Sequence, residues 1–426
     1  MGYLRLLRRP RILLLWAAQT LSVLGDRMYA LVVMWLVWET TGSAALMGLV
    51  AVVESVPYIA AGMIGHRLLG RFSTLGRLAA LDAARMLVVA ALPVVWAVHG
   101  ASLAALLVVA ALLGVLGALF DPNLGALVPD LVRADEVQAV TGLMDLVGRI
   151  ARIAGPGAAG LLLLALPEIT LYVVDAVTFG VSAAVLTLLA RRQTKTPATA
   201  TGRREPIVMA PALGRPRAWR LVSAYPVTAC MVALHGAGQM LLGVALVLPA
   251  LLALRGGDSS TLYAAVSTAT GAGAVLTNMV VGNVRAAMVF PGAYCVAWIV
   301  HGVVMAATGV VGSAGWIVAL SLLAGAVGPF LAVGLRTHLA EFERSERLAW
   351  MTLDQTVLRA AGTAGTLVLP MLAAPLPATG FVVGGVATVA VAALAWAAAG
   401  VLRSRAVSRA GGGALVAEHA GGPSPR

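Results

Sequence analysis

Residues 286–335 read AAMVFPGAYCVAWIVHGVVMAATGVVGSAGWIVALSLLAGAVGPFLAVGL and contain no Asp, Glu, Lys or Arg. Residues 360–402 form a second stretch without any of these four residue types. One membrane-spanning helix needs about 20 predominantly apolar residues, so each stretch is long enough for two spans. Turn-forming residues divide both, at Gly309 to Gly315 and at Pro375 with Pro377. The two stretches therefore predict an integral membrane protein that lies in a lipid bilayer.

The composition of the 426-residue chain supports this prediction, because 60% of its residues are hydrophobic and only 11% are charged. The net charge of +12 does not indicate a nucleic-acid partner, since the basic residues fall in short clusters between apolar runs. Cys230 and Cys295 lie inside apolar segments, which indicates unpaired thiols and no metal site. The chain carries no phosphate-binding loop, zinc-protease motif or hydrolase motif, so we expect neither an enzyme nor a cofactor.

Hydropathy predicts an all-α membrane protein of about twelve transmembrane helices in two six-helix bundles, residues 1–190 and 221–405. Residues 191–220, rich in Pro, Thr and basic residues, are expected to link the bundles, and residues 406–426 to form a disordered tail. The expected spans are 12–38, 44–65, 78–98, 102–120, 140–166, 170–190, 226–254, 260–282, 287–308, 311–335, 349–373 and 378–402.

The basic residues predict the orientation. Arginines and the one lysine cluster in every second loop and at both ends of the chain, while Arg255 alone falls on the opposite side. Positively charged loops stay in the cytoplasm, so we expect an inner-membrane protein with both termini cytoplasmic.

Four charged residues fall near the centres of predicted spans: Asp26, Glu54, Arg149 and Arg152. A charged side chain at this depth costs about 2.5–3.5 kcal/mol, so four facing lipid would cost roughly 10–14 kcal/mol. They must face the protein interior. Intramembrane acids usually mark ion pathways, which makes Asp26 and Glu54 the candidate proton-coupling residues, although Glu54 could instead neutralise Arg149 or Arg152.

Polar residues follow one face of the first span, because Gln19, Ser22, Asp26 and Tyr29 recur at helical spacing. A polar stripe through a spanning helix predicts the wall of a substrate cavity. The alternative is that Asp26 only pairs with Arg27 or with an arginine of the fifth span.

The second half of the chain carries fewer intramembrane polar residues. Arg359 is central in its span and is expected to be a cavity charge, and His235 with Gln239 is a candidate for the cavity wall. In the first half, Asp82 and Arg85 stand three residues apart near the cytoplasmic end of a span, which predicts an ion pair of structural or gating role.

Several stretches resemble the major facilitator superfamily, and within it the macrolide-efflux and enterobactin-exporter-like branch. They are Leu15–Ser22 with Gly25-Asp26, Glu39–Ala44, Glu54–Pro57, Phe120–Pro122 with Val128–Val132, and Asp175–Phe179. The resemblance implies alternating access by two rocking bundles. It also implies a glycine-proline motif in the fifth span, here Gly142, Gly155, Pro156 and Gly160, and a gate in the loop before the third span, here with Arg71. Gly70 stands in that loop where the family usually has an acid.

The residues and the resemblance together predict a monomeric secondary transporter that exchanges protons for an amphipathic drug, antibiotic or secreted metabolite. A siderophore or lysolipid carrier, an importer, and a non-transporting receptor or scaffold are the alternatives. Neutralising Asp26 would leave a receptor intact but not an antiporter.

The orientation gives the first testable prediction. A reporter fused after Arg203 should read cytoplasmic, and one fused at Gly256 should read external, because residues 221–254 form a single uncharged stretch between the two sites. Alkaline phosphatase and green fluorescent protein fusions measure this. The same reading from both sites would contradict the twelve-span layout.

Overall fold

The computed structural model describes residues 2–64, 66–100, 102–163, 166–167, 169–193, 218–255, 259–282 and 290–419. Within these ranges helices are the only regular secondary structure, which confirms the predicted all-α fold. Eleven of the described helical segments are long and apolar enough to cross a membrane. The remaining one, α3 (Ala44–Ile64), has a shorter apolar stretch over Leu46–Gly62 and completes the predicted set of twelve.

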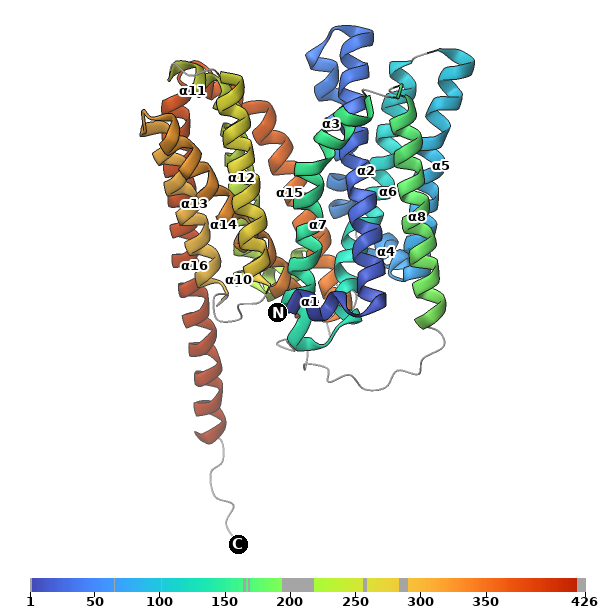
Figure 1. Cartoon of the computed structure of the whole chain (residues 1–426). Helices are drawn as coiled ribbons and strands as arrows, with labels where there is room; N and C mark the ends of the chain where they lie inside the picture. The colour runs from blue at the N-terminus through green and yellow to red at the C-terminus, as the bar shows by residue number, and fades with distance from the viewer. Residues whose placement is uncertain are drawn as a thin grey trace.

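The helices form two groups, one from each half of the chain (Figure 1). The N-terminal bundle consists of α1 (Gly2–Leu7), α2 (Pro10–Thr41), α3, α4 (His66–Leu69), η1 (Gly70–Phe72), α5 (Leu75–His99), α6 (Leu103–Leu127), η2 (Val128–Leu131), η3 (Ala134–Glu136), α7 (Val137–Leu163) and α8 (Ile169–Gln193). The C-terminal bundle consists of α9 (Ala218–Ala224), α10 (Pro226–Leu241), η4 (Leu242–Val247), α11 (Leu248–Leu254), α12 (Ser259–Val281), α13 (Gly292–Val310), α14 (Ala314–Ala340), α15 (Arg344–Ala373) and α16 (Pro377–His419).

Local sequence signals set the helix ends. The Ser102 hydroxyl caps α6 by accepting a hydrogen bond from the Ala105 amide, and Thr74 caps α5 in the same way. Gly42 ends α2 in a left-handed conformation with φ 62°, which a residue without a Cβ adopts at no steric cost. These caps keep the connections short.

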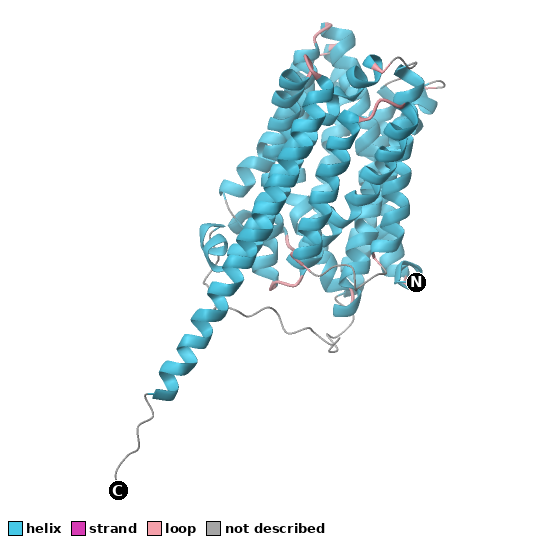
Figure 2. Cartoon of the chain, turned by 90° about the vertical axis from the view of Figure 1, so that its left-hand side faces the viewer, coloured by secondary structure: helices cyan, strands magenta, loops and turns pink. Residues whose placement is uncertain are grey.

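Two segments outside the spans are the C-terminal part of α16 and the linker between the bundles. α16 continues as a helix to His419 and projects beyond the bundle (Figure 2), whereas we expected residues 406–426 to be disordered. Once a helix has formed, each further residue adds a hydrogen bond at little nucleation cost. Most of the expected linker, residues 194–217, lies outside the described residues, as do residues 420–426.

The bundles contact each other through a limited set of helices. α15 packs against α3 and α6, and α7 packs against α12 and α14. Most cross-bundle hydrogen bonds between described residues gather at the end where α1 lies and from which α16 projects (Figure 1). We call this the closed end, and define it by Tyr3, Asp130, Asn278, Arg344 and Arg347. Another cross-bundle hydrogen bond joins the Thr356 hydroxyl of α15, as donor, to the Tyr58 carbonyl of α3 over 3.0 Å.

Close helix contacts are made at glycines. A Cβ built on Gly302 of α13 would lie 2.7 Å from the Gly385 carbonyl oxygen of α16. In the N-terminal bundle a Cβ on Gly155 of α7 would lie 2.6 Å from the Arg27 Cβ of α2. Small residues allow this approach of two backbones in a membrane, so Gly155 of the predicted glycine-proline motif is a contact point between α2 and α7.

The structure predicts that Gly155→Leu lowers the melting temperature of the detergent-solubilised protein. The new side chain must displace Arg27, and overpacking of this kind costs about 1–3 kcal/mol. Gly157→Leu is the matched control, because a Cβ at Gly157 meets nothing within 4 Å. Equal melting temperatures for the two variants in a thermal-shift assay would contradict the close contact.

Candidate functional site

A chain of polar contacts runs through the interior of the N-terminal bundle. The Gln19 amide of α2 donates to the Ser182 hydroxyl of α8 over 2.9 Å, and Ser182 donates to Asp82 of α5 over 2.6 Å. Asp82 also forms an ion pair with Arg85 over 3.3 Å. Asp82 and Arg85 are 1% and 7% exposed, so the pair is enclosed within the bundle.

Arg85 extends this chain toward the C-terminal bundle. Its guanidinium lies 3.7 Å from Asp121 of α6, which accepts a hydrogen bond from the Tyr58 hydroxyl of α3 over 2.7 Å. The Tyr58 ring in turn lies 4.2 Å below the guanidinium of Arg359, which comes from α15 of the other bundle. Arg359 therefore reaches across the interface, and the cation–π contact joins the two halves of the molecule.

The three residues expected at the cytoplasmic gate, Arg71, Asp82 and Arg85, do not lie together. Asp82 and Arg85 form the predicted ion pair, but their side chains turn inward, and the Phe120 ring lies 4.5 Å from the Arg85 guanidinium. Neither forms a hydrogen bond or ion pair with the C-terminal bundle in the described part of the chain, where their polar partners are each other, Ser182 and Asp121. Arg71 is exposed, and its carbonyl accepts a hydrogen bond from Arg77 within the same loop.

The stripe of Gln19, Ser22 and Tyr29 also lies differently from expectation. Gln19 and Ser22 are 5% and 4% exposed, and the Tyr29 ring packs edge-on against Tyr172 of α8 with centroids 5.6 Å apart. The stripe therefore faces α8 inside the bundle rather than the space between the bundles. A polar stripe identifies the protein-facing side of a helix but does not say which neighbour covers it.

Asp26 and Glu54 lie among charged groups without forming an ion pair within 4 Å in the described structure. Arg85 is the cation that attracts the Asp26 carboxylate most strongly. Arg359, Arg27 and Arg85, in that order, attract the Glu54 carboxylate. Both acids are partly exposed. The alternative pairings that the sequence left open, Asp26 with Arg27 and Glu54 with an arginine of α7, do not form.

The arginines of α7 differ in their surroundings. Arg149 forms an ion pair with Asp145 one turn away, over 2.6 Å, and its guanidinium approaches Gly328 of α14. Arg152 is exposed, and the charged groups that act on it are Arg27, Arg149 and Asp145. Of the three expected cavity charges, Arg149 and Arg359 thus lie where the bundles meet. Gly142 and Gly155 are buried, Gly160 is exposed, and the side chain of Pro156 lies outside the description.

His235 of α10 is corrected from a cavity residue to a core residue. Its Nδ1 lies 2.7 Å from a carboxylate oxygen of Asp354 on α15, and both side chains are almost fully buried. The Trp298 ring packs beside the imidazole, with centroids 6.3 Å apart. Gln239, one turn further along α10, is partly exposed. A buried His–Asp pair satisfies two polar groups at once, which explains why both are tolerated in an apolar bundle.

The closed end contains cross-bundle contacts that the sequence did not reveal. Arg347, at the start of α15, pairs with Asp130 of η2 over 2.7 Å and donates to the Ala126 carbonyl over 2.9 Å. Arg344 lies 3.7 Å from the same carboxylate and also donates to the Ser73 carbonyl. Both arginines belong to the C-terminal bundle and all three acceptors to the N-terminal one. The only sequence signal was that Asp130 lies in the family-like Val128–Val132 stretch.

Tyr3 makes a second cross-bundle contact at the closed end. Its hydroxyl donates to the Asn278 carbonyl of α12 over 2.8 Å, and Asn278 donates to Asp145 of α7 over 2.8 Å. Burial, and next the Asp145 carboxylate, raise the pKa of the Tyr3 phenol above its ordinary value, so it stays protonated and able to donate. The ring fits against Gly142 and Gly282, where any Cβ would collide with it.

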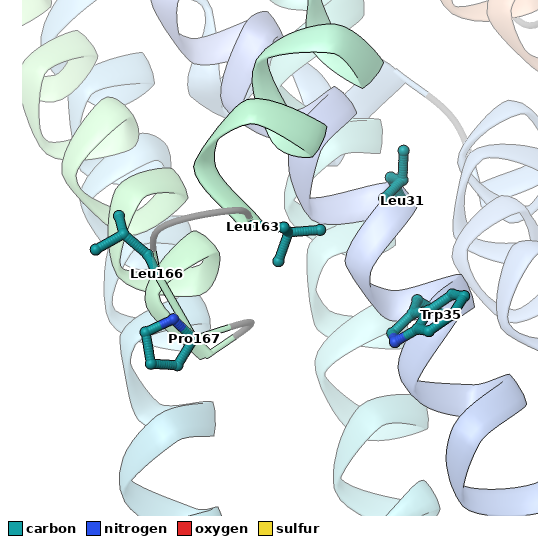
Figure 3. Close-up of a pocket in the computed structure, with 5 residues that line it drawn as sticks. All are labelled: Leu31, Trp35, Leu163, Leu166 and Pro167. Atoms are coloured by element: carbon teal, nitrogen blue, oxygen red, sulfur yellow. The ribbon is translucent and has the colours of Figure 1, made fainter.

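An apolar pocket of about 580 Å³ lies toward the opposite end of the molecule (Figure 3). Leu31 and Trp35 of α2 form one side, and Leu163 of α7 with Leu166 and Pro167 forms the other. None of these five side chains is ionisable. The pocket offers apolar surface but no charge chemistry of its own.

The comparison with protein families decides the identity of the fold. Residues 15–294 match the model described as Major Facilitator Superfamily. The chain belongs to the Major Facilitator Superfamily. It is accordingly a multi-pass membrane protein of a family of secondary transporters.

Solved structures of Major Facilitator Superfamily transporters share this fold at low sequence identity. A bacterial homologue of the iron transporter ferroportin, in its outward-facing state, is 14% identical with a TM-score of 0.68, and the match covers 90% of this chain and 96% of that one. The human organic anion transporter TETRAN is 15% identical with a TM-score of 0.63, over 90% and 98% of the two chains. The Escherichia coli fucose:proton symporter is 12% identical with a TM-score of 0.60, over 90% and 97%. No curated protein sequence matches the chain.

The closed end of this superfamily member gives a prediction. Arg347→Ala removes two cross-bundle bonds and should destabilise the closed end by about 1–2 kcal/mol, a change of roughly 5- to 30-fold in the population ratio of its closed and open forms. Spin labels at Arg133 and Glu343, both exposed, report the separation by electron–electron resonance in a cysteine-free background. We expect a longer distance to gain population.

Arg5→Ala is the matched control, because Arg5 is an exposed arginine of α1 at the same end. Asp130→Asn should shift the distances in the same direction as Arg347→Ala. An unchanged distance distribution in both gate variants would show that these bonds do not hold the closed end shut.

Proposed function

We propose that this chain is a proton-coupled exporter of amphipathic small molecules, of the macrolide-efflux and enterobactin-exporter-like branch, acting as a monomer in the inner membrane with both termini cytoplasmic. Asp26 and Glu54 are the proton-coupling residues in this proposal. The observation that carries it is that two acids at mid-membrane depth, on neighbouring helices, each lack an ion-pair partner in the described structure.

The position of the two acids supports a coupling role. Glu54 lies where α3 crosses α6, and a Cβ on Gly114 would collide with the Glu54 backbone. Arg359, the cation that attracts Glu54 most strongly, belongs to the opposite bundle. The charge of Glu54 therefore affects how strongly the two bundles attract each other. Protonation of Glu54 would weaken that attraction, which is how a proton alters the relative stability of two conformations.

The closed end supports the direction of access. The basic residues favour a cytoplasmic location for the chain termini, and most cross-bundle bonds gather at that same end. In this proposal the structure is therefore an outward-facing state, with its cytoplasmic side sealed. Such a state would release substrate and take up protons from outside.

The energy available is sufficient for export. One charge crossing 100 mV is worth about 2.3 kcal/mol, so a membrane at roughly −150 mV supplies about 3.5 kcal/mol per proton. This corresponds to a substrate gradient of a few hundredfold.

Asp26→Asn tests the proposal. A growth-inhibition panel in an efflux-deficient host first identifies a compound against which the wild-type chain protects. In everted vesicles we expect Asp26→Asn to reduce compound-driven proton release at least about tenfold, because the isosteric amide binds no proton at working pH. Binding of the compound should remain, and Asp26→Glu should keep part of the activity.

Glu39→Gln is the matched control, since Glu39 is an exposed acid of the same helix. If Asp26→Asn releases protons at the wild-type rate, Glu54 takes over the coupling role. Normal proton release by Glu54→Gln as well would exclude coupling through this pair.

A further inference from the structure

Two arginines, Arg27 and Arg152, lie near the contact between α2 and α7. The contact point is Gly155, whose position brings α7 against the Cβ of Arg27. Arg152 lies three residues before Gly155, which is about one helical turn. Arg27 and Arg152 therefore come from different helices at the same level of the N-terminal bundle, and both side chains are exposed.

No acid neutralises these two arginines directly. In the described part of the chain neither forms an ion pair within 4 Å. Asp145, the acid that acts on Arg152, is already paired with Arg149 over 2.6 Å and bonded to Asn278 over 2.8 Å. Two of the three charged groups around Arg152 are the cations Arg27 and Arg149, which repel it.

The acid beside Arg27 is shared in a similar way. The Glu54 carboxylate attracts Arg27 electrostatically, but its attraction to Arg359 is stronger. Asp121 also attracts Arg359, but it already forms an ion pair with Arg85 over 3.7 Å. The three arginines Arg27, Arg152 and Arg359 therefore share Glu54 and part of the charge of Asp121. Charges at this depth that are not balanced by protein acids require water or an anion.

Apolar surface begins one turn from the arginines. Leu31 and Trp35 follow Arg27 at intervals of four residues, which places them about 6 and 12 Å further along α2. With Leu163 they line the open apolar pocket of about 580 Å³ (Figure 3). The two arginines and the apolar pocket thus lie one after the other along the axes of α2 and α7.

We propose that Arg27 and Arg152 bind the anionic group of an amphipathic substrate whose apolar part lies in the pocket of Leu31, Trp35 and Leu163. The substrate class is an organic anion with a carboxylate, sulfonate or phosphate group. Two guanidinium groups suit such a group because each presents parallel N–H donors to a pair of oxygens. This assignment rests on the proposed transport function and names its substrate class.

The test uses two fluorescent probes that differ only by a sulfonate: anilinonaphthalene sulfonate, an anion, and N-phenylnaphthylamine, which is neutral. The full-length chain is reconstituted in phosphatidylcholine nanodiscs, and the signal of empty nanodiscs is subtracted. We expect Arg27→Gln and Arg152→Gln each to weaken binding of the sulfonate about tenfold or more, and of the neutral probe less than about twofold. Trp35→Ala should weaken both probes.

Two further variants guard against misfolding and nonspecific charge effects. Arg152→Lys keeps the charge but not the paired donors, so it should bind the sulfonate with intermediate affinity. Arg11→Gln is the matched control, because Arg11 is an exposed arginine at the other end of α2. Retained binding of the neutral probe shows that the pocket is intact in each variant.

Three results would overturn the assignment. The first is wild-type sulfonate affinity in the Arg27→Gln/Arg152→Gln double variant, and the second is equal loss of both probes in it. The third is loss of sulfonate binding when the nanodiscs contain phosphatidylglycerol, which would show that the site holds a lipid headgroup. The probe assay contains no pH gradient and measures no proton release, so the substrate assignment and the coupling proposal fail separately.

Discussion

A charged side chain in the hydrocarbon region of a bilayer needs a partner or water, because exposing it to lipid costs about 2.5–3.5 kcal/mol. The N-terminal bundle meets this constraint in two ways. Arg85 is enclosed: Asp82 and Asp121 balance its charge, and aromatic rings cover it. Arg152 and Arg27 remain exposed. The enclosed charges fix how α3, α5, α6 and α8 pack, while the exposed ones stay available to a molecule that enters between the bundles.

The two bundles differ in their interior polar contacts and in what they contribute to the interface. The C-terminal bundle packs through glycine–backbone contacts such as Gly302 with Gly385, and its interior polar chemistry in the described residues centres on the His235–Asp354 pair. Its contribution to the interface consists mainly of side chains that reach across, above all Arg359 and Arg347. A rocking motion can therefore leave the inside of each bundle unchanged. Only contacts that cross the interface have to break and re-form, and those are the contacts on which substrate and protons can act.

Sequence reasoning succeeded where the lipid environment imposes a rule along the chain, and failed where the answer depended on long-range packing. Hydropathy predicted the spans because an unbroken apolar stretch has few other uses. The Asp82–Arg85 pair followed from a spacing of three residues. The side toward which Gln19 and Ser22 turn depended on the position of α8, and the His235–Asp354 and Arg347–Asp130 pairs join residues 119 and 217 positions apart. No periodicity within one helix contains that information.

The composition of the closed end explains how it can both seal and open. The superfamily usually places an acid where this chain has Gly70, and here the carboxylate that meets the start of α15 is Asp130 instead. Two further acceptors of the arginines at the start of α15, the carbonyl groups of Ala126 and Ser73, are neutral. A hydrogen bond of this kind contributes about 0.5–1.5 kcal/mol net, because water replaces it when it breaks. Asp130 is itself 39% exposed, so its ion pairs avoid the large penalty of an orphaned buried charge. Several modest bonds in parallel hold one conformation while leaving the other within reach of a single proton or substrate molecule.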